Sequence, residues 1–175
     1  MKTLSKTFGL FMFGLVLTAC ESDNPDPLGL PTEPQTSFAA TVSWSSSGNS
    51  IGSSWATPFV QRQFRGSGTA DLLSDVTMES AHTEIYRSYD SFDIENGQIT
   101  LTGESEEQIY AVYSGSGSRT YGHEELNLKC TVQGGTGRFS NATGYLTIEV
   151  SRINQAALSP NMSAFIYGII YLNQE

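Results

Sequence analysis

The sequence has little cysteine, little basic charge and no convincing helical pattern. Its 175 residues include two cysteines, and nine Lys and Arg stand against 18 Asp and Glu, a formal net charge of −9. So few basic groups argue against binding nucleic acid by neutralising phosphates. The hydrophobic content of 38% is too low for a polytopic membrane protein and too high for a disordered chain. The length allows one ordinary domain with a tail.

The first apolar run is short and follows basic residues. Lys2 and Lys6 precede the run from Phe8 to Ala19. As a helix, this run would reach about 18 Å, well short of a hydrocarbon core of about 30 Å. The pattern predicts a signal peptide over residues 1–19 rather than a transmembrane helix.

The end of this run, Leu17-Thr18-Ala19-Cys20, resembles the lipobox of bacterial lipoproteins. The resemblance implies that diacylglycerol is attached to the Cys20 thiol and that the mature chain starts at Cys20, anchored in a lipid bilayer by acyl chains. Loss of the two signal lysines would leave a net charge of −11. The alternative is a cysteine that follows a hydrophobic segment by chance.

Residues after Cys20 bear on localisation in the cell envelope. Glu21 is not the Asp that resembles an inner-membrane retention signal, which favours the outer membrane. Glu21-Ser22-Asp23 also resembles the surface-export tags of Bacteroidetes lipoproteins. Periplasmic and external display both stay open.

A proline-rich linker is expected over residues 20–35, because Pro25, Pro27, Pro31 and Pro34 favour extended conformations. The rest, 36–175, is expected to form one β domain. Short β-branched and aromatic segments alternate with Gly, Ser and Asn. The expected strands are 36–46, 59–70, 74–86, 91–95, 98–104, 107–115, 125–133, 142–152 and 162–172.

Connections are expected at three places between these strands. Asn96-Gly97 predicts a two-residue hairpin, because both residues tolerate positive φ. Segments 45–54 and 115–118 are expected to be longer, flexible loops. Many short strands without a βαβ pattern favour an antiparallel barrel or, alternatively, a β-sandwich.

The last expected strand, 162–172, is hydrophobic on both faces. Phe165, Tyr167, Ile169 and Tyr171 share one face, and Ala164, Ile166, Gly168, Ile170 and Leu172 the other. A strand of this kind needs cover on both sides. A homo-oligomer formed through 162–172 is therefore one expectation.

Cys130 has no expected disulfide partner if Cys20 carries lipid. It alternates with Leu128 and Val132 on one strand face, so a buried inert thiol is expected rather than a nucleophile.

One glycine-rich motif reads Gly134-Gly135-Thr136-Gly137-Arg138-Phe139 and is followed by Gly144. The glycines permit a tight turn, after which Phe139 can fold back as a plug at a barrel end and Arg138 can offer its donor fork to a carboxylate or carbonyls. No P-loop lysine follows, so nucleotide binding is not expected.

This motif is similar to that of the dirigent and allene oxide cyclase barrels, and closer still to small secreted bacterial proteins of that type. The resemblance implies a single antiparallel, roughly eight-stranded closed barrel with a narrow lumen. Dirigent proteins have an arginine where this chain has Thr143. No catalytic residue is carried over, because fold likeness does not transmit function.

Titratable residues on 74–86 have two interpretations. The favoured one puts Ser80, His82, Glu84 and Tyr86 on the solvent face. The alternative turns His82, Glu84 and Tyr86 into the lumen, where they and Tyr110 would be candidate binding or catalytic groups. No metal site or cofactor is expected, since two histidines and one thiol do not readily make a four-ligand site.

The expected function is that of a non-enzymatic envelope barrel that binds a small apolar ligand or a partner protein. One alternative is an isomerase or cyclase acting on a lipid-like substrate in the lumen. Another is a structural subunit of a surface complex.

Overall fold

The computed structural model describes residues 35–54, 57–120, 123–153 and 162–172. The expected signal peptide and almost all of the expected linker lie outside these ranges, and so does Cys20. The elements are β1 (Gln35–Ser54), β2 (Thr57–Ala70), β3 (Ser74–Tyr86), β4 (Ser91–Gly103), β5 (Gln108–Thr120), β6 (His123–Gly135), the 3-10 helix η1 (Gly137–Phe139), β7 (Thr143–Ile153) and β8 (Met162–Tyr171).

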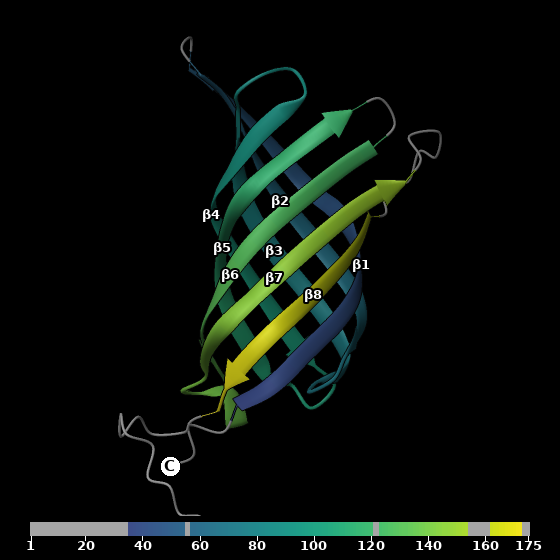
Figure 1. Ribbon diagram of the computed structural model, residues 1–175, viewed down its shortest axis with the longest axis vertical. Helices are drawn as coiled ribbons and strands as arrows, with labels where there is room; N and C mark the ends of the chain where they lie inside the picture. The colour runs from purple at the N-terminus through teal and green to yellow at the C-terminus, as the bar shows by residue number, and fades with distance from the viewer. Residues whose placement is uncertain (1–34, 55–56, 121–122, 154–161, 173–175) are drawn as a thin grey trace, which may run out of the picture. The chain divides into compact units, whose positions relative to one another are not determined.

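The strands form a closed antiparallel barrel in the order of the sequence, with β8 returning to pair with β1. Thr41 of β1 lies opposite Phe165 of β8, and Gln35 opposite Tyr171. Figure 1 shows the strands wrapping steeply around the barrel axis. The closed barrel is confirmed and the sandwich alternative is excluded, because every strand is paired on both sides. No helix in the described ranges is long and apolar enough to cross a membrane.

Strict alternation of side chains makes the core. In β6 every second residue from Glu124 to Val132 is buried, and those between them are exposed. This is the period-two pattern of a sheet with one face packed and one in water. Cys130 is among the buried residues, as expected, and is 3% exposed. Large side chains such as Trp44, Phe38 and Phe92 are almost fully buried and fill the interior as one cluster.

The Asn96-Gly97 hairpin prediction is wrong, because both residues lie inside β4. Asn96 has a φ of 54°, and the register of β4 shifts between Ile94 and Gly97 against β5. Asn tolerates this left-handed conformation, and a bulge uses it to bend a strand without ending it. Predicted strands 91–95 and 98–104 are therefore one bent strand.

The two expected loops are also strand. Residues 48–54 pair with β2, and 115–118 pair with β4 and β6. At Gly115 a Cβ would lie 2.1 Å from the carbonyl oxygen of Asn127. Gly115 therefore permits β5 and β6 to pack closely here.

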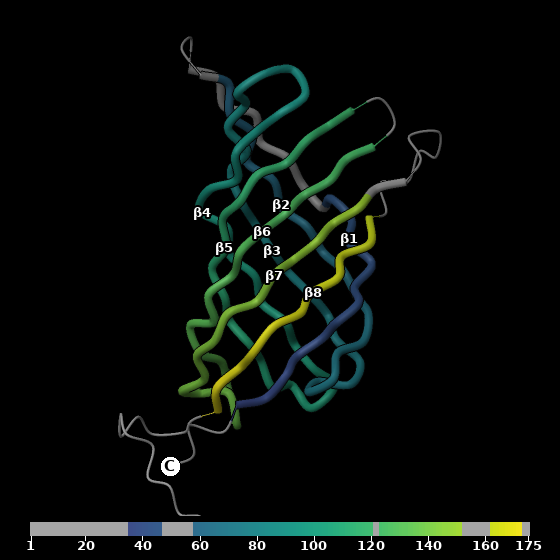
Figure 2. The backbone as a smooth tube through the Cα atoms, in the orientation of Figure 1, coloured from purple at the N-terminus to yellow at the C-terminus, as the bar shows by residue number. Residues whose placement is uncertain are grey.

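One end of the barrel is closed by the glycine-rich turn. Phe139 of η1 is 0% exposed. Figure 2 shows that β1 begins and β8 ends at this same end. The opposite end carries the β3–β4 turn at 87–90, so the two ends of the lumen differ in structure.

Candidate functional site

The even-numbered residues of β3 from Val76 to Glu84 point into the lumen and Tyr86 is half-buried, so the favoured solvent-face interpretation is wrong. His82 is 2% exposed and Glu84 1%, whereas Ala81 lies outside. The sequence held a signal for this: Val76 and Met78 have the same parity as His82 and are core residues. Polar groups were expected outside because burial without partners is costly, and here the partners come from other strands.

Glu84 is the centre of a buried polar cluster. Its Oε1 lies 2.6 Å from Nε of Arg62 and 3.6 Å from Nε2 of His82, and its Oε2 accepts a 2.8 Å hydrogen bond from the Tyr86 hydroxyl. Arg62 comes from β2, and the other three residues from β3. One carboxylate therefore gathers groups from two strands.

Arg119 extends the cluster to two more strands. Its guanidinium, on β5, donates 2.8 Å to Glu124 on β6 and 2.9 Å to the Tyr86 hydroxyl. It also lies over the Phe92 ring, 5.3 Å from the centroid. Two guanidinium groups thus face two carboxylates, so the charges of these four groups balance.

His82 connects the cluster to the aromatic core. Its Nδ1 is 2.8 Å from the Tyr113 hydroxyl. Because Nε2 faces the Glu84 carboxylate, we assign a ring proton to Nε2, which lets Nδ1 accept a hydrogen bond from the Tyr113 hydroxyl. Burial raises the pKa of Tyr113 well above its ordinary value, so its hydroxyl stays protonated and can only donate or accept hydrogen bonds.

Burial and pairing oppose one another at the charged groups. Burial by itself disfavours the ionised form of Glu84, but the nearby His82 ring, the Arg62 charge and the hydrogen bond from the Tyr86 hydroxyl hold the Glu84 pKa below the usual carboxyl value. Burial likewise disfavours the Arg62 charge, and Glu84 reverses this and raises the Arg62 pKa. Both groups are ionised at neutral pH and depend on each other.

This cluster has the groups for acid–base chemistry but little access to a substrate. Tyr113 is 4% exposed and His82 2%, and both pack among aromatic rings, with Phe64 5.1 Å from the His82 ring. The isomerase or cyclase alternative needs an open cavity beside such groups. Among the described residues they are packed against each other, which favours a structural role.

Tyr110 lies outside the lumen, contrary to the alternative that grouped it with His82, Glu84 and Tyr86. Its side chain is 38% exposed on the outer face of β5. The neighbouring Ile109 and Ala111 point inward. Because side chains alternate along a strand, Tyr110 between them points outward.

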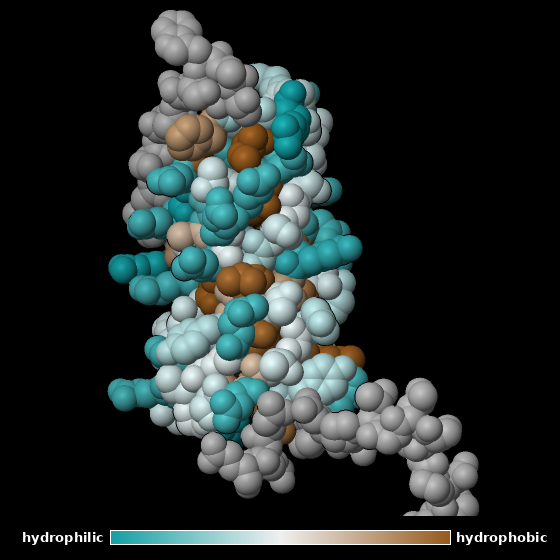
Figure 3. Space-filling model, turned by 90° about the vertical axis from the view of Figure 1, so that its left-hand side faces the viewer, coloured by the Kyte–Doolittle hydropathy of each residue, from teal (hydrophilic) through white to brown (hydrophobic). Residues whose placement is uncertain are grey.

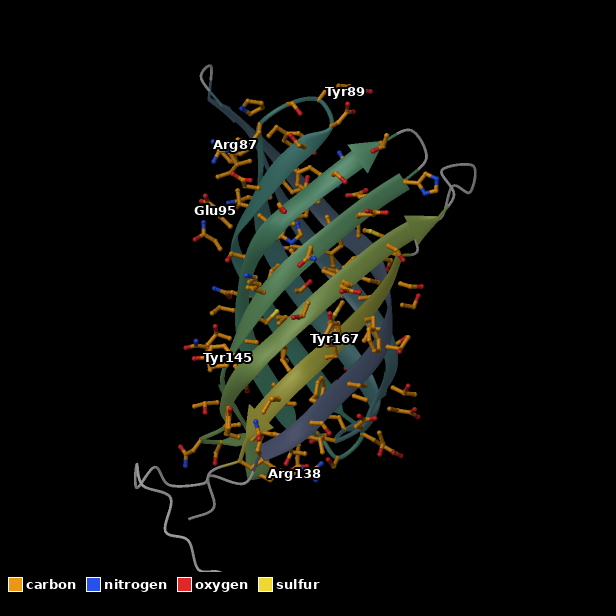
Figure 4. The ribbon with its side chains drawn as sticks, viewed as in Figure 1. Arg87, Tyr89, Glu95, Arg138, Tyr145 and Tyr167 are labelled. Atoms are coloured by element: carbon orange, nitrogen blue, oxygen red, sulfur yellow. The ribbon has the colours of Figure 1, made fainter. Side chains whose placement is uncertain are left out.

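Residues of the glycine-rich motif hold the closed end together. Arg138 lies 3.2 Å from Oε2 of Glu107 through Nε, and its NH2 donates to the carbonyl of Leu72. Gly137 has a φ of 57°. Thr136 accepts a 2.9 Å hydrogen bond from the Gln108 backbone through its hydroxyl. Figure 4 shows Arg138 at this end of the barrel, far from Arg87 and Tyr89. The motif therefore acts as a structural cap.

The outer wall carries a groove that was not expected from the sequence. It has a volume of about 670 Å³ and spans β4 to β8 and β1. Strand pairing aligns two rows of side chains across it. One row is Asp93, Ser116, Asn127, Glu149, Phe165 and Thr41. The other is Ser91, Ser118, Glu125, Ser151 and Ser163.

The shape and charge of the groove follow from these rows. Five serines with short side chains line the groove, and Phe165, which is 46% exposed, lines it on β8. Asp93 is paired with Arg87 at 2.6 Å, and Glu149 accepts 2.8 Å from the Tyr167 hydroxyl. Asp93, Glu125 and Glu149 together outnumber the one positive charge of Arg87 in the groove. The net negative charge disfavours anionic ligands. The sequence signal that was missed is Gly115 to Ser118, which was expected to be a flexible loop and instead supplies Ser116 and Ser118 to the groove.

No cluster of three or more His, Cys, Asp and Glu suited to a metal ion occurs in the described part of the chain.

Comparison with known proteins shows no family for this chain. No protein-family model matches the chain, and no curated protein matches it. One similar solved structure is that of a dirigent protein. It is the pterocarpan synthase dirigent protein GePTS1, aligned over 90% of this chain and 99% of that chain with 15% identity and a TM-score of 0.43. Nothing about ligand or reaction follows from a likeness of this size.

Proposed function

We propose that the chain is a lipoprotein of the outer membrane, anchored through acylated Cys20, whose barrel is a non-enzymatic binding protein. We further propose that the ligand lies in the outer groove and not in the lumen. The observation that supports this most is the groove itself, a row of serines aligned across the wall over a lumen packed with side chains. The small apolar ligand expected from the sequence would have to displace that core.

The anchor rests on the lipobox-like Leu17-Thr18-Ala19-Cys20. Mass spectrometry of the N-terminal peptide from producing cells tests it. A diacylglyceryl-modified Cys20 is the expected result, and an unmodified thiol on an uncleaved chain would refute it. Protease treatment of intact cells then separates external display, in which the domain is cut, from periplasmic display, in which it is protected.

The chemistry of the groove favours a neutral, hydroxyl-rich ligand, and short oligosaccharides are the class to test. Serine hydroxyls, the Asn127 amide and carboxylates can each exchange hydrogen bonds with sugar hydroxyls. The Phe165 ring offers an apolar face for stacking on sugar C–H groups. A groove of about 670 Å³ is within the usual size of small-molecule sites.

Titration calorimetry of the full chain in detergent against neutral and carboxylated oligosaccharides tests this ligand class. We expect binding of neutral members and a loss of tenfold or more in Asn127→Ala. Lys129→Ala is the matched control, since Lys129 is exposed on the same strand two residues outside the groove. No neutral ligand, or equal losses in both variants, would rule the groove out.

A further inference from the structure

Two adjacent strands form an uncharged wall on an acidic protein. Among the eight described strands, only β1 and β8 contain no Asp, Glu, Lys, Arg or His, although the chain carries a net charge of −9. Like-charged copies repel each other over most of their surface. This wall is where two copies could approach without bringing charges together.

The wall has a ridge and a furrow side by side. On β8, Phe165 and Ile169 are exposed, and Tyr167 packs beside Phe165 with ring centroids 5.2 Å apart. On β1 the outward side chains from residue 37 to residue 43 are small. They are Ser37, Ala39, Thr41 and Ser43. Figure 4 shows where Tyr167 lies on this side of the barrel.

We propose that this wall joins two copies of the chain around a two-fold axis. The axis lies outside the barrel, between the two copies, parallel to β1 and β8 and facing the line midway between these strands. Such an axis places β8 of each copy over β1 of the other. Strand pairing sets Phe165, Tyr167 and Ile169 level with Thr41, Ala39 and Ser37. Each ridge then enters the furrow of the second copy, and the contact is self-complementary, as a two-fold interface requires.

The size of the wall fits a weak dimer. Strands of this length rise about 33 Å, and the wall together with the neighbouring β7, which carries Glu149 opposite Phe165, is roughly 15 Å wide. The accessible surface of such a footprint is on the order of 600–800 Å² per copy, near the lower end for specific interfaces. We therefore expect dissociation in the micromolar range. The face shown in Figure 3 is less suited to a dimer contact, because its hydrophobic residues lie in separate small areas among polar ones.

The second copy would also border the groove. Phe165 and Thr41 belong to both the wall and the groove edge, so the second copy and a groove ligand would compete for the Phe165 ring. The dimer needs neither the anchor nor the groove ligand, so it can fail or stand separately from the proposed function.

Sedimentation velocity of the full chain in detergent tests the dimer. We expect a concentration-dependent monomer–dimer equilibrium, weakened at least tenfold by Phe165→Glu. Val112→Glu is the matched control, because Val112 is 43% exposed on β5, away from the wall. Unfolding by urea, measured in parallel, shows whether either variant perturbs the fold. A monomer at all concentrations, or equal weakening by both variants, would overturn the proposal.

Cross-linking tests the axis without perturbing the wall by charge. Ala39→Cys, treated with a short bis-maleimide in producing cells, should give a covalent dimer. Thr77→Cys, exposed on β3, should not. The parent chain sets the background, and buried Cys130, whose pKa burial raises to about 12, stays unreactive. Equal cross-linking from both positions, or none from Ala39→Cys, would contradict this arrangement.

Discussion

At the scale of residues, the lumen cluster shows how a buried charge depends on its partner. Glu84 is 1% exposed in side chain beside Arg62, which is 19% exposed. We expect Glu84→Gln to lower the free energy of unfolding by about 3 kcal/mol, because it leaves the Arg62 charge uncompensated. Urea unfolding measures this. The control is Glu79→Gln, since Glu79 pairs with Arg65 at 69% and 72% exposure and should cost under about 0.5 kcal/mol.

The same cluster predicts a pH dependence with a definite sign. The folded-state pKa of Glu84 is lowered, so its contribution to stability is present above the ordinary carboxyl pKa of about 4.3 and is lost as pH falls below it. Urea midpoints between pH 3 and pH 7 should fall less steeply in Glu84→Gln than in the parent chain. If the urea midpoints of the two proteins fall in parallel with pH, Glu84 does not contribute to the pH dependence of stability.

At the scale of elements, the bulge in β4 depends on one residue. Asn96 has a φ of 54°, which a β-branched residue adopts at a cost of about 1–2 kcal/mol. We expect Asn96→Val to lower the free energy of unfolding by that amount and Asn96→Gly to be tolerated. Glu95→Val, at the exposed neighbouring position, is the control and should change stability by under about 0.5 kcal/mol.

The closed end of the barrel depends on the plug from η1. Phe139 is 0% exposed, so Phe139→Ala should lower the free energy of unfolding by about 3–5 kcal/mol through the cavity it leaves. Tyr89→Ala provides the comparison, because Tyr89 is 93% exposed and should be close to neutral. Similar urea midpoints for the two variants would mean that the turn does not seal the core.

At the scale of the whole molecule, closure by β8 removes all sheet edges. Deleting β8 and the residues after it would leave β1 and β7 with unpaired backbone groups along their length. Such edges pair with other chains. We expect the shortened chain to aggregate, as measured by light scattering, whereas Val112→Glu keeps the barrel closed and should stay dispersed.

Much of the fold could be predicted from residues that act locally. The alternation of Leu128, Cys130 and Val132 placed β6 and the buried thiol correctly, and the range 74–86 coincides with β3. The cluster could not be predicted in the same way, because Arg62 and Arg119 reach Glu84 and Tyr86 only through strand pairing. The groove likewise consists of residues aligned by register and not by spacing.

The sequence by itself determined that this chain makes strands with two unlike faces and a tight glycine-rich turn, because side-chain alternation and backbone freedom act over a few residues. Only the tertiary structure decided which face of β3 lies inside, that Asn96 bends a strand rather than ending it, and that serines from distant strands form a groove. These outcomes depend on which strands become neighbours, and closure of the barrel between β1 and β8 sets that for the whole sheet.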